Sequence, residues 1–221
     1  MLDHLHQPYL ERLAAAGVEP GAIDYVLITH LHADHVGWNT RWLEERWVPT
    51  FPHATYVFSA LEQKYCAGLT SGDGRVQAVL SEANLGTPVR TLVSGVYADS
   101  VAPIVESGLA KLIQIEGSEF IDGFSFYPTP GHSIDHATIF LRSEGETALF
   151  GGDVLHHPLE IYQPDIVSMF CVFPGAARKS RLGCSIMPLR VAQFISAVIS
   201  LKDPLDASRK IRASTDGTLF E

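Results

Sequence analysis

The sequence has few cysteines and no hydrophobic run long enough to cross a bilayer. Of 221 residues only Cys66, Cys171 and Cys184 are cysteines, and none of their spacings forms a CxxC pair. An odd number of scattered cysteines argues against a disulfide framework and favours a reducing compartment. No apolar run approaches the ~20 residues of a membrane-spanning helix, and the first residues do not resemble a signal peptide. We therefore expect a cytoplasmic protein without a membrane partner.

Basic residues are also scarce, since 16 Lys and Arg face 25 Asp and Glu, which gives a net charge of -9. The imbalance lies in residues 1–170, with 8 basic and 21 acidic side chains; residues 171–221 have 8 basic and 4 acidic ones. An acidic body repels nucleic acid, and the basic residues of the tail are scattered rather than clustered with aromatic ones. We expect a small-molecule substrate and no nucleic-acid partner.

Short apolar runs alternate with helical patterns, which predicts a layered α+β or α/β domain. The chain length and a hydrophobic content of 46% suit one sizeable domain. Ser59 and Glu62 form a capping-box pattern for a helix that begins near residue 60. The three tryptophans either line a pocket or, more commonly for such residues, pack in the core. The predicted strands are 25–28, 55–58, 112–115, 124–127, 137–141 and 147–150; the other predicted elements are helices 2–16 and 100–109, a loop at 67–74 and a candidate helix at 191–201.

A dense group of metal-ligand residues follows the first predicted strand: His30, His32, Asp34 and His35 lie within six residues. Imidazole and carboxylate are ligands of zinc and similar divalent ions. In an extended segment, positions 30, 32 and 34 point the same way, and a turn at Asp34-His35 would direct these two at a second ion. A surface His-rich loop or buried structural histidines is the alternative, and the spacing argues against it.

Two later strands end in the same way. The strand at 124–127 leads into Pro130-Gly131-His132, and the strand at 147–150 leads into Gly151-Gly152-Asp153. Each motif alone is weak, because Gly-Asp after a strand is usually a simple turn. Together with the first cluster, in this order, they predict three ligand-bearing loops.

These motifs resemble those of the metallo-β-lactamase fold superfamily of metal-dependent hydrolases, and the flanking residues are similar to its branch of lactonases and organophosphate hydrolases. The resemblance covers about residues 24–168. It implies an α+β fold, an αββα sandwich with two ions, usually zinc, at the edge of the sheets; iron and manganese are alternatives. It further implies that Asp153 bridges both ions and that Asp34 also shuttles a proton. By position, the ligands of the first ion would be His30, His32 and His132, and those of the second Asp34 and His35.

Three other histidines lie near these ligands in the sequence. His136 is either a hydrogen-bond partner of a ligand or a structural residue. His156 and His157 either orient Asp153 and touch substrate, or cap helices and face solvent.

Two parts of the superfamily pattern are missing. The resemblance implies a seventh ligand, a histidine well downstream of Asp153, but no histidine follows His157. It also implies more strands before His30. We therefore expect an incomplete sandwich: residues 1–170 as a hydrolase-like domain with its N-terminal strands largely missing, and residues 171–221 as an atypical tail. A reading-frame shift is one hypothesis for the tail, and inspection of the coding DNA would test it.

These gaps have physical consequences. An uncovered sheet edge would favour a homodimer, and a missing ligand would weaken the second metal site. His156 or His157 could replace that ligand, although both are close to Asp153 in sequence. The preferred function is hydrolysis of a lactone, ester or phosphotriester by metal-bound hydroxide. The alternative is an inactive or impaired metal-binding fragment that lacks the last ligand histidine.

Overall fold

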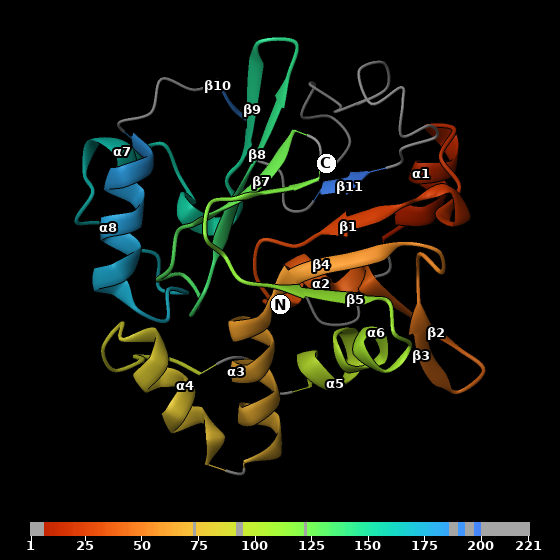
Figure 1. The fold of residues 1–221 in the computed structure, drawn as a ribbon, viewed down its shortest axis with the longest axis horizontal. Helices are drawn as coiled ribbons and strands as arrows, with labels where there is room; N and C mark the ends of the chain where they lie inside the picture. Colours follow the sequence, from red (N-terminus) through yellow and green to blue (C-terminus); the bar gives the residue numbers. More distant parts are fainter. Residues whose placement is uncertain are drawn as a thin grey trace.

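The computed structural model describes residues 7–72, 74–91, 95–121, 123–185, 190–192 and 197–199. Two β-sheets form its centre (Figure 1). The first has the strand order β11-β1-β4-β5 and the second the order β10-β9-β8-β7-β6. The strands of the first sheet are β1 (Tyr25–Leu27), β4 (Thr55–Ser59), β5 (Ala110–Ile113) and β11 (Ala197–Ile199). Those of the second are β6 (Glu119–Ile121), β7 (Phe124–Pro128), β8 (Ala137–Ser143), β9 (Glu146–Phe150) and β10 (Arg190–Ala192).

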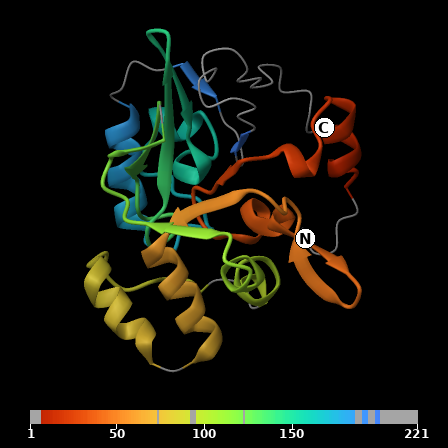
Figure 2. The same cartoon turned by 45° about the vertical axis from the view of Figure 1, so that its right-hand side comes forward.

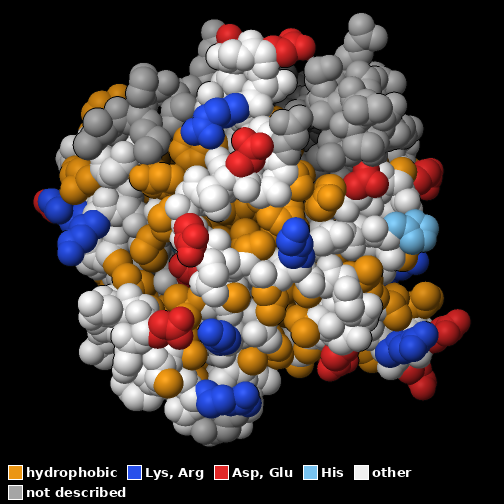
Figure 3. Space-filling view, viewed as in Figure 1, with side chains coloured by type: hydrophobic (Ala, Val, Ile, Leu, Met, Phe, Trp, Pro, Cys, Tyr) orange, Lys and Arg blue, Asp and Glu red, His pale blue; other side chains and the backbone are white. Residues whose placement is uncertain are grey.

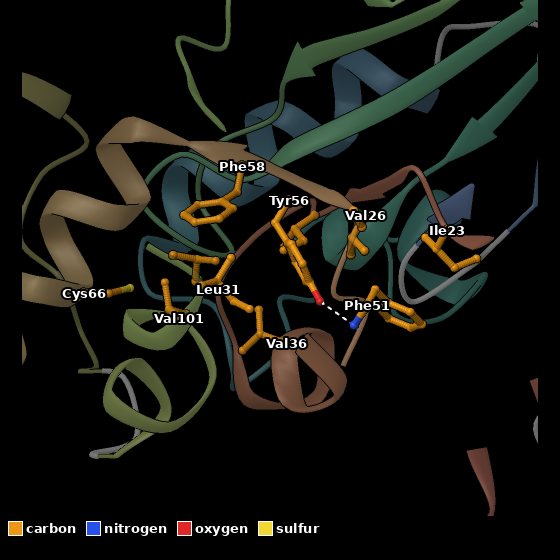
Figure 4. Packing of buried hydrophobic residues seen from close by; sticks show 12 residues of the cluster. Ile23, Val26, Leu31, Val36, Phe51, Tyr56, Phe58, Cys66 and Val101 are labelled. Atoms are coloured by element: carbon orange, nitrogen blue, oxygen red, sulfur yellow. Dashed lines mark hydrogen bonds between the residues drawn. The ribbon is translucent and has the colours of Figure 1, made fainter. Parts of the chain in front are cut away.

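In the first sheet, β1 and β4 are buried on both faces, which explains their apolar sequences. β1, β4 and β5 run parallel to one another. Leu27 and Val57 pack against the second sheet, while Tyr56 and Phe58 face the opposite way, into a cluster covered by helices. In Figure 4, Tyr56 lies at the centre of that cluster, where its hydroxyl accepts a hydrogen bond from the backbone N–H of Phe51 at 3.0 Å.

Helices cover the outer face of each sheet. Beneath the first sheet lie α3, α5 and α6, with α4 beside α3 (Figures 1 and 2). On the outer face of the second sheet lies α8, where the Cys184 thiol makes a hydrogen bond to Thr138 of β8. The αββα arrangement is thereby confirmed. The helices are α1 (Tyr9–Ala15), α2 (Ala33–Val36), α3 (Ala60–Ser71), α4 (Arg75–Ala83), α5 (Val96–Ser100), α6 (Ala102–Glu106), α7 (Leu159–Tyr162) and α8 (Pro174–Ser185), with 3₁₀ turns η1 (Pro20–Ala22), η2 (Gly37–Asn39) and η3 (Gly152–Val154).

Several predicted elements have other boundaries. The predicted loop at 67–74 is wrong over its first half, because α3 continues to Ser71 and ends at Gly72, whose φ of 65° terminates the helix. Instead of one helix at 100–109 there are two, α5 and α6, since Val101 between them is not helical. The strand expected at 112–115 begins two residues earlier, as β5. Of the expected helix at 2–16, residues 9–15 form α1, and residues 1–6 lie outside the described part.

The segment after Cys171 departs most from expectation. Residues 171–185, expected to begin an atypical tail, contribute buried Cys171, Val172 and Phe173 and the helix α8. The candidate helix at 191–201 is wrong, because residues 190–192 and 197–199 are the strands β10 and β11. Their content of Val and Ile favours strands. β11 pairs antiparallel with β1, so the edge of β1 that we expected to be unpaired is covered over Tyr25–Leu27.

A hairpin of β2 (Thr40–Leu43) and β3 (Arg46–Pro49) projects from the body in both ribbon views (Figure 2). Its tryptophans Trp42 and Trp47 pack edge to face, with ring centroids 5.2 Å apart. Trp42 is 59% exposed, so it is not a core residue. On the face shown in Figure 3, Lys and Arg side chains stand singly among acidic and apolar ones. Within the described residues, no helix is long and apolar enough to span a membrane.

Candidate metal centre

The three ligand-bearing loops meet at one end of the two sheets. The loop after β1 carries His30 and His32, the loop after β7 carries His132, and η3 after β9 carries Asp153. The ring centroid of His30 lies 4.5 Å from that of His32 and 4.7 Å from that of His132. Asp153 Oδ2 lies 3.2 Å from His132 Nε2. The predicted convergence of these loops is therefore present.

The first loop leaves β1 as extended chain and then turns into the short helix α2. The backbone N–H of Ala137 donates to the carbonyl of Thr29, which ties this loop to β8. His32 is the extended residue before the helix, and α2 carries His35 back over His30, with ring centroids 4.1 Å apart. Because the chain is already helical at Asp34, this side chain does not share the direction of His30 and His32. It is 43% exposed, with its Oδ2 3.8 Å from His35 Nε2.

Two glycines are required for the other loops to reach the site. Gly131 has a φ of 129°, and a Cβ there would lie 2.0 Å from the backbone nitrogen of Ala177 in α8. Gly152 has a φ of 53°, and a Cβ there would lie 2.7 Å from His136 Nε2. L-residues rarely adopt such φ values. The Pro-Gly-His and Gly-Asp motifs therefore reflect both backbone conformation and close packing.

The N-terminus of α3 positions the His132 loop. The Ser59 side chain accepts the backbone N–H groups of Leu61 and Glu62, as predicted, and donates to Asp135. The glutamate half of the capping box is wrong: Glu62 Oε1 instead accepts hydrogen bonds from the Ser133 hydroxyl and, at 2.8 Å, from the Asp135 N–H. Glu62 is fully buried, and desolvation raises its pKa to about 7 despite these hydrogen bonds.

Three groups of side chains could each hold an ion, because within each group the candidate ligand atoms lie within 4.8 Å of one another. The groups are His30–His32–His132, His30–His35–Asp153 and His132–Asp153–His156. One observation favours a cation here: Nε2 of His30 is buried and makes no hydrogen bond. A buried nitrogen without a partner is costly, and its lone pair is a metal donor. The donor set of imidazoles and a carboxylate suits zinc, and also iron and manganese.

Burial keeps the imidazoles in the form that binds metal. Desolvation first, and then neighbouring histidines, lower the pKa of His32 to about 4 and that of His132 to about 2, although nearby aspartates oppose the shift. The pKa of His30 is also well below its ordinary value, for the same reasons. A neutral imidazole has a free lone pair, so these nitrogens are available as ligands at neutral pH.

Asp153 occupies the position expected of a bridging carboxylate. Its Oδ1 lies 3.2 Å from His35 Nε2, and its Oδ2 lies 3.2 Å from His132 Nε2, so the two oxygens face different histidines. Despite desolvation, the nearby imidazoles of His156, His35 and His132 hold the pKa of Asp153 well below its usual range. His136 lies behind it: Nε2 of His136 accepts the backbone N–H of Asp153. This contact supports the interpretation of His136 as a hydrogen-bond partner.

Asp34 is expected both to bind the second ion and to shuttle a proton. It belongs to none of the three groups, and its partly exposed carboxylate lies beside the buried His35. Both of its roles stay predictions. His157 is exposed, and its Nδ1 accepts the backbone N–H of Leu159, as a capping residue does. His156 lies beside Asp153.

Sequence reasoning did not single out Glu62 as a support of the His132 loop, nor Glu160 and Arg181. Glu160 and Arg181 are buried near Asp153, with Arg181 Nε 3.5 Å from Glu160 Oε2. The sequence carries little signal for either residue, because charged side chains are mostly exposed.

Comparison with known proteins identifies the class. The family model of the metallo-beta-lactamase superfamily matches residues 3–187, and the chain belongs to this superfamily. The probable metallo-hydrolase YybB of Bacillus subtilis (strain 168) is 26% identical over 166 residues, which cover 71% of this chain and 62% of that protein. The chain thus spans about three fifths of this relative's length.

Two solved structures show the same fold. The crystal structure of the hydrolase AbOPH has a TM-score of 0.61 and 26% identity, and the match covers 79% of this chain and 56% of that one. AidC, a dizinc quorum-quenching lactonase, has a TM-score of 0.60 and 18% identity over 79% of this chain and 56% of its own. At 18% identity, the second likeness bears on the fold alone.

Proposed function

We propose that this chain acts as a metal-dependent hydrolase on a lactone, ester or phosphotriester. The observation that carries the proposal is the convergence of His30, His32 and His132 with His35 and Asp153, including the buried, unbonded Nε2 of His30. Membership of the metallo-beta-lactamase superfamily and the similarity to the hydrolase AbOPH support it. We propose zinc as the resident ion, with iron and manganese as alternatives.

Each residue has a proposed part in this reaction. A bound ion pair would activate a water as nucleophile and polarise the carbonyl or phosphoryl oxygen under attack. His30, His32 and His132 would hold one ion and His35 the other, with Asp153 between them. Asp34 is exposed beside His35, where its carboxylate can exchange a proton with the leaving group and with solvent. The acidic charge of residues 1–170 favours a small-molecule substrate over nucleic acid.

The cysteines bear on the proposed location of the protein. Cys66, Cys171 and Cys184 are all free thiols, which supports a cytoplasmic location. A homodimer is proposed only on the basis of the sequence.

The experiment measures bound metal per chain and the hydrolysis of a lactone and of an aryl phosphotriester, with and without a chelator. We expect bound metal and chelator-sensitive turnover in the wild type, and loss of both in a His30→Ala variant. A His53→Ala variant is the matched control, because His53 is an exposed imidazole whose Nδ1 lies 3.1 Å from the carbonyl oxygen of Gly21. Bound metal without turnover would favour the impaired metal-binding fragment, and a chain with less than one ion would overturn the proposal.

A further inference from the structure

His156 lies closer to the candidate metal centre than its place in the sequence suggests. It follows Asp153 by three residues, yet the chain turns through η3 so that His156 Nε2 reaches 3.4 Å from Asp153 Oδ2. Its ring centroid is 4.9 Å from that of His132. His132, Asp153 and His156 therefore form one of the three groups that could hold an ion. Closeness to Asp153 in sequence does not prevent His156 from reaching the centre.

The opposite side of the His156 ring faces a buried carboxylate. Nδ1 of His156 lies 3.7 Å from Glu160 Oε1, and the backbone N–H of His156 donates to Glu160 Oε2 at 2.9 Å. Glu160 is 4% exposed, and Arg181 of α8 is fully buried beside it. In metal centres, a ligand imidazole commonly donates its other N–H to a carboxylate, which fixes the tautomer and makes the ligand nitrogen more basic. Here the Glu160 carboxylate lies on that side of the ring, although at 3.7 Å it does not accept a hydrogen bond from Nδ1, and both ring nitrogens of His156 are buried without a hydrogen-bond partner.

The remaining histidines of the described chain are not equivalent to His156. Both nitrogens of His136 are engaged, Nδ1 with Thr129 and Nε2 with the N–H of Asp153. His157 is exposed and caps Leu159, and His53 contacts the carbonyl of Gly21. Besides the histidines carried over from the superfamily pattern, His156 is the one in this part of the chain whose ring nitrogen faces the centre.

We infer that His156 is a further metal ligand, binding through Nε2 on the side of Asp153 Oδ2 that it shares with His132, with the Glu160 carboxylate beside its other ring nitrogen. This rests on the proposed function, since it assigns a ligand to the same metal centre. The ligand comes from the loop of the bridging carboxylate rather than from a strand farther along the chain. The centre then has an imidazole beyond the six residues of this chain that match the superfamily pattern by position.

The test measures Zn²⁺ affinity by competition with a chromophoric chelator for the wild type and for His156→Ala. Loss of a residue outside the coordination sphere typically costs about 10–100-fold in affinity, so we expect loss of this ligand to cost at least ~100-fold for one equivalent of Zn²⁺. His157→Gln is the matched control, because it changes the neighbouring but exposed imidazole; its affinity should equal that of the wild type. Circular dichroism of the metal-free variants checks that each is folded.

A second variant gives a signal specific to coordination. His156→Cys places a thiolate where the imidazole stood, and with Co²⁺ it should gain a thiolate-to-cobalt charge-transfer absorption that the wild type lacks. This measurement decides the question even where His156→Ala fails to fold. Unchanged Zn²⁺ affinity in folded His156→Ala, or Co²⁺ bound to His156→Cys without the new absorption, would overturn the inference and leave the proposed function standing. A wild type that binds no metal would instead overturn the proposed function, and the inference with it.

Discussion

The backbone N–H of Asp153 donates a hydrogen bond to Nε2 of His136 over 3.0 Å, and the other ring nitrogen of His136 lies 2.8 Å from the Thr129 hydroxyl. Because Nε2 accepts this bond, the ring is neutral and carries its proton on Nδ1. Desolvation supports this state by lowering the pKa of His136 to about 3. A buried imidazole outside the metal groups thus fixes the backbone of the residue that faces both sides of the centre.

Replacing His136 should therefore weaken metal binding without removing a ligand. His136→Phe fills a similar volume but leaves the Asp153 N–H without its acceptor, which costs about 1–3 kcal/mol of unfolding free energy. We expect metal affinity to fall by about 10–100-fold, measured by chelator competition. His53→Phe is the control at an exposed position. Wild-type affinity in His136→Phe would show that this hydrogen bond does not position Asp153.

Gly131 should be the least replaceable glycine of the site. In Gly131→Ala the new methyl group would meet the backbone of α8 at Ala177, at a φ that alanine rarely adopts. Gly145→Ala is a matched control, because Gly145 also has a positive φ, of 82°, but a Cβ there meets nothing within 4 Å. The control should lose only the conformational cost of about 1–2 kcal/mol. We expect Gly131→Ala to lose clearly more in urea unfolding, and equal losses would contradict the close approach of α8.

The ligand loops could be predicted from sequence because their signals are local. An apolar strand followed within a few residues by His or Asp describes residues 25–35, 124–132 and 147–153 alike, with glycine at the turn in the second and third. β7 and β9 lie on either side of β8 and antiparallel to it, so their carboxyl ends lie at the same end of the second sheet, whereas β1 belongs to the first sheet and reaches them through the packing of the two sheets. Asp34 shows the limit of such reasoning, because the period of two fails where α2 begins at Ala33.

The supporting residues could not be predicted, because their partners are distant in sequence. Glu62 matched a capping box, which is a local pattern, but its carboxylate bonds to residues 133 and 135. Arg181 reads as a charge on a polar helix, and only the packing of α8 against η3 makes it buried. Likewise, the pairing of β11 with β1 joins the two ends of the described chain, and no local pattern specifies it.

Glu62 should make the free energy of unfolding depend on pH. Burial raises its pKa from 4.5 to about 7, so between these values the folded chain holds a proton that the unfolded chain has lost. Stability therefore falls as the pH rises through this window, by up to ~1.4 kcal/mol for each pH unit. Glu62→Gln keeps an oxygen that can accept from Ser133 and Asp135 but cannot ionise, so it should remove this contribution.

The measurement is urea unfolding of the metal-free chain at about pH 5 and about pH 8. Relative to wild type, Glu62→Gln should gain stability at the higher pH and little at the lower one. The exposed Glu106→Gln variant should follow the wild type at both. A Glu62→Gln difference that is the same at both pH values would mean that Glu62 is ionised throughout, contrary to the effect of its burial.

Arg181 should stabilise the loop that carries Asp153 and His156, although it lies in the segment beyond residue 170. Its guanidinium donates to the carbonyls of Val154, Pro164 and Ile166 and lies beside Glu160. Arg181→Met would leave a buried carboxylate without its cation, a change that typically costs about 3–5 kcal/mol. Arg178→Met on the same helix breaks only an exposed ion pair with Asp165 and should cost about 0–1 kcal/mol. Chemical unfolding of both variants, followed by chelator competition, measures these effects.

Because Glu160 holds His156 in turn, we also expect Arg181→Met to weaken metal binding where Arg178→Met does not. Equal stability of the two variants would mean that α8 does not support the metal-binding loop through Arg181.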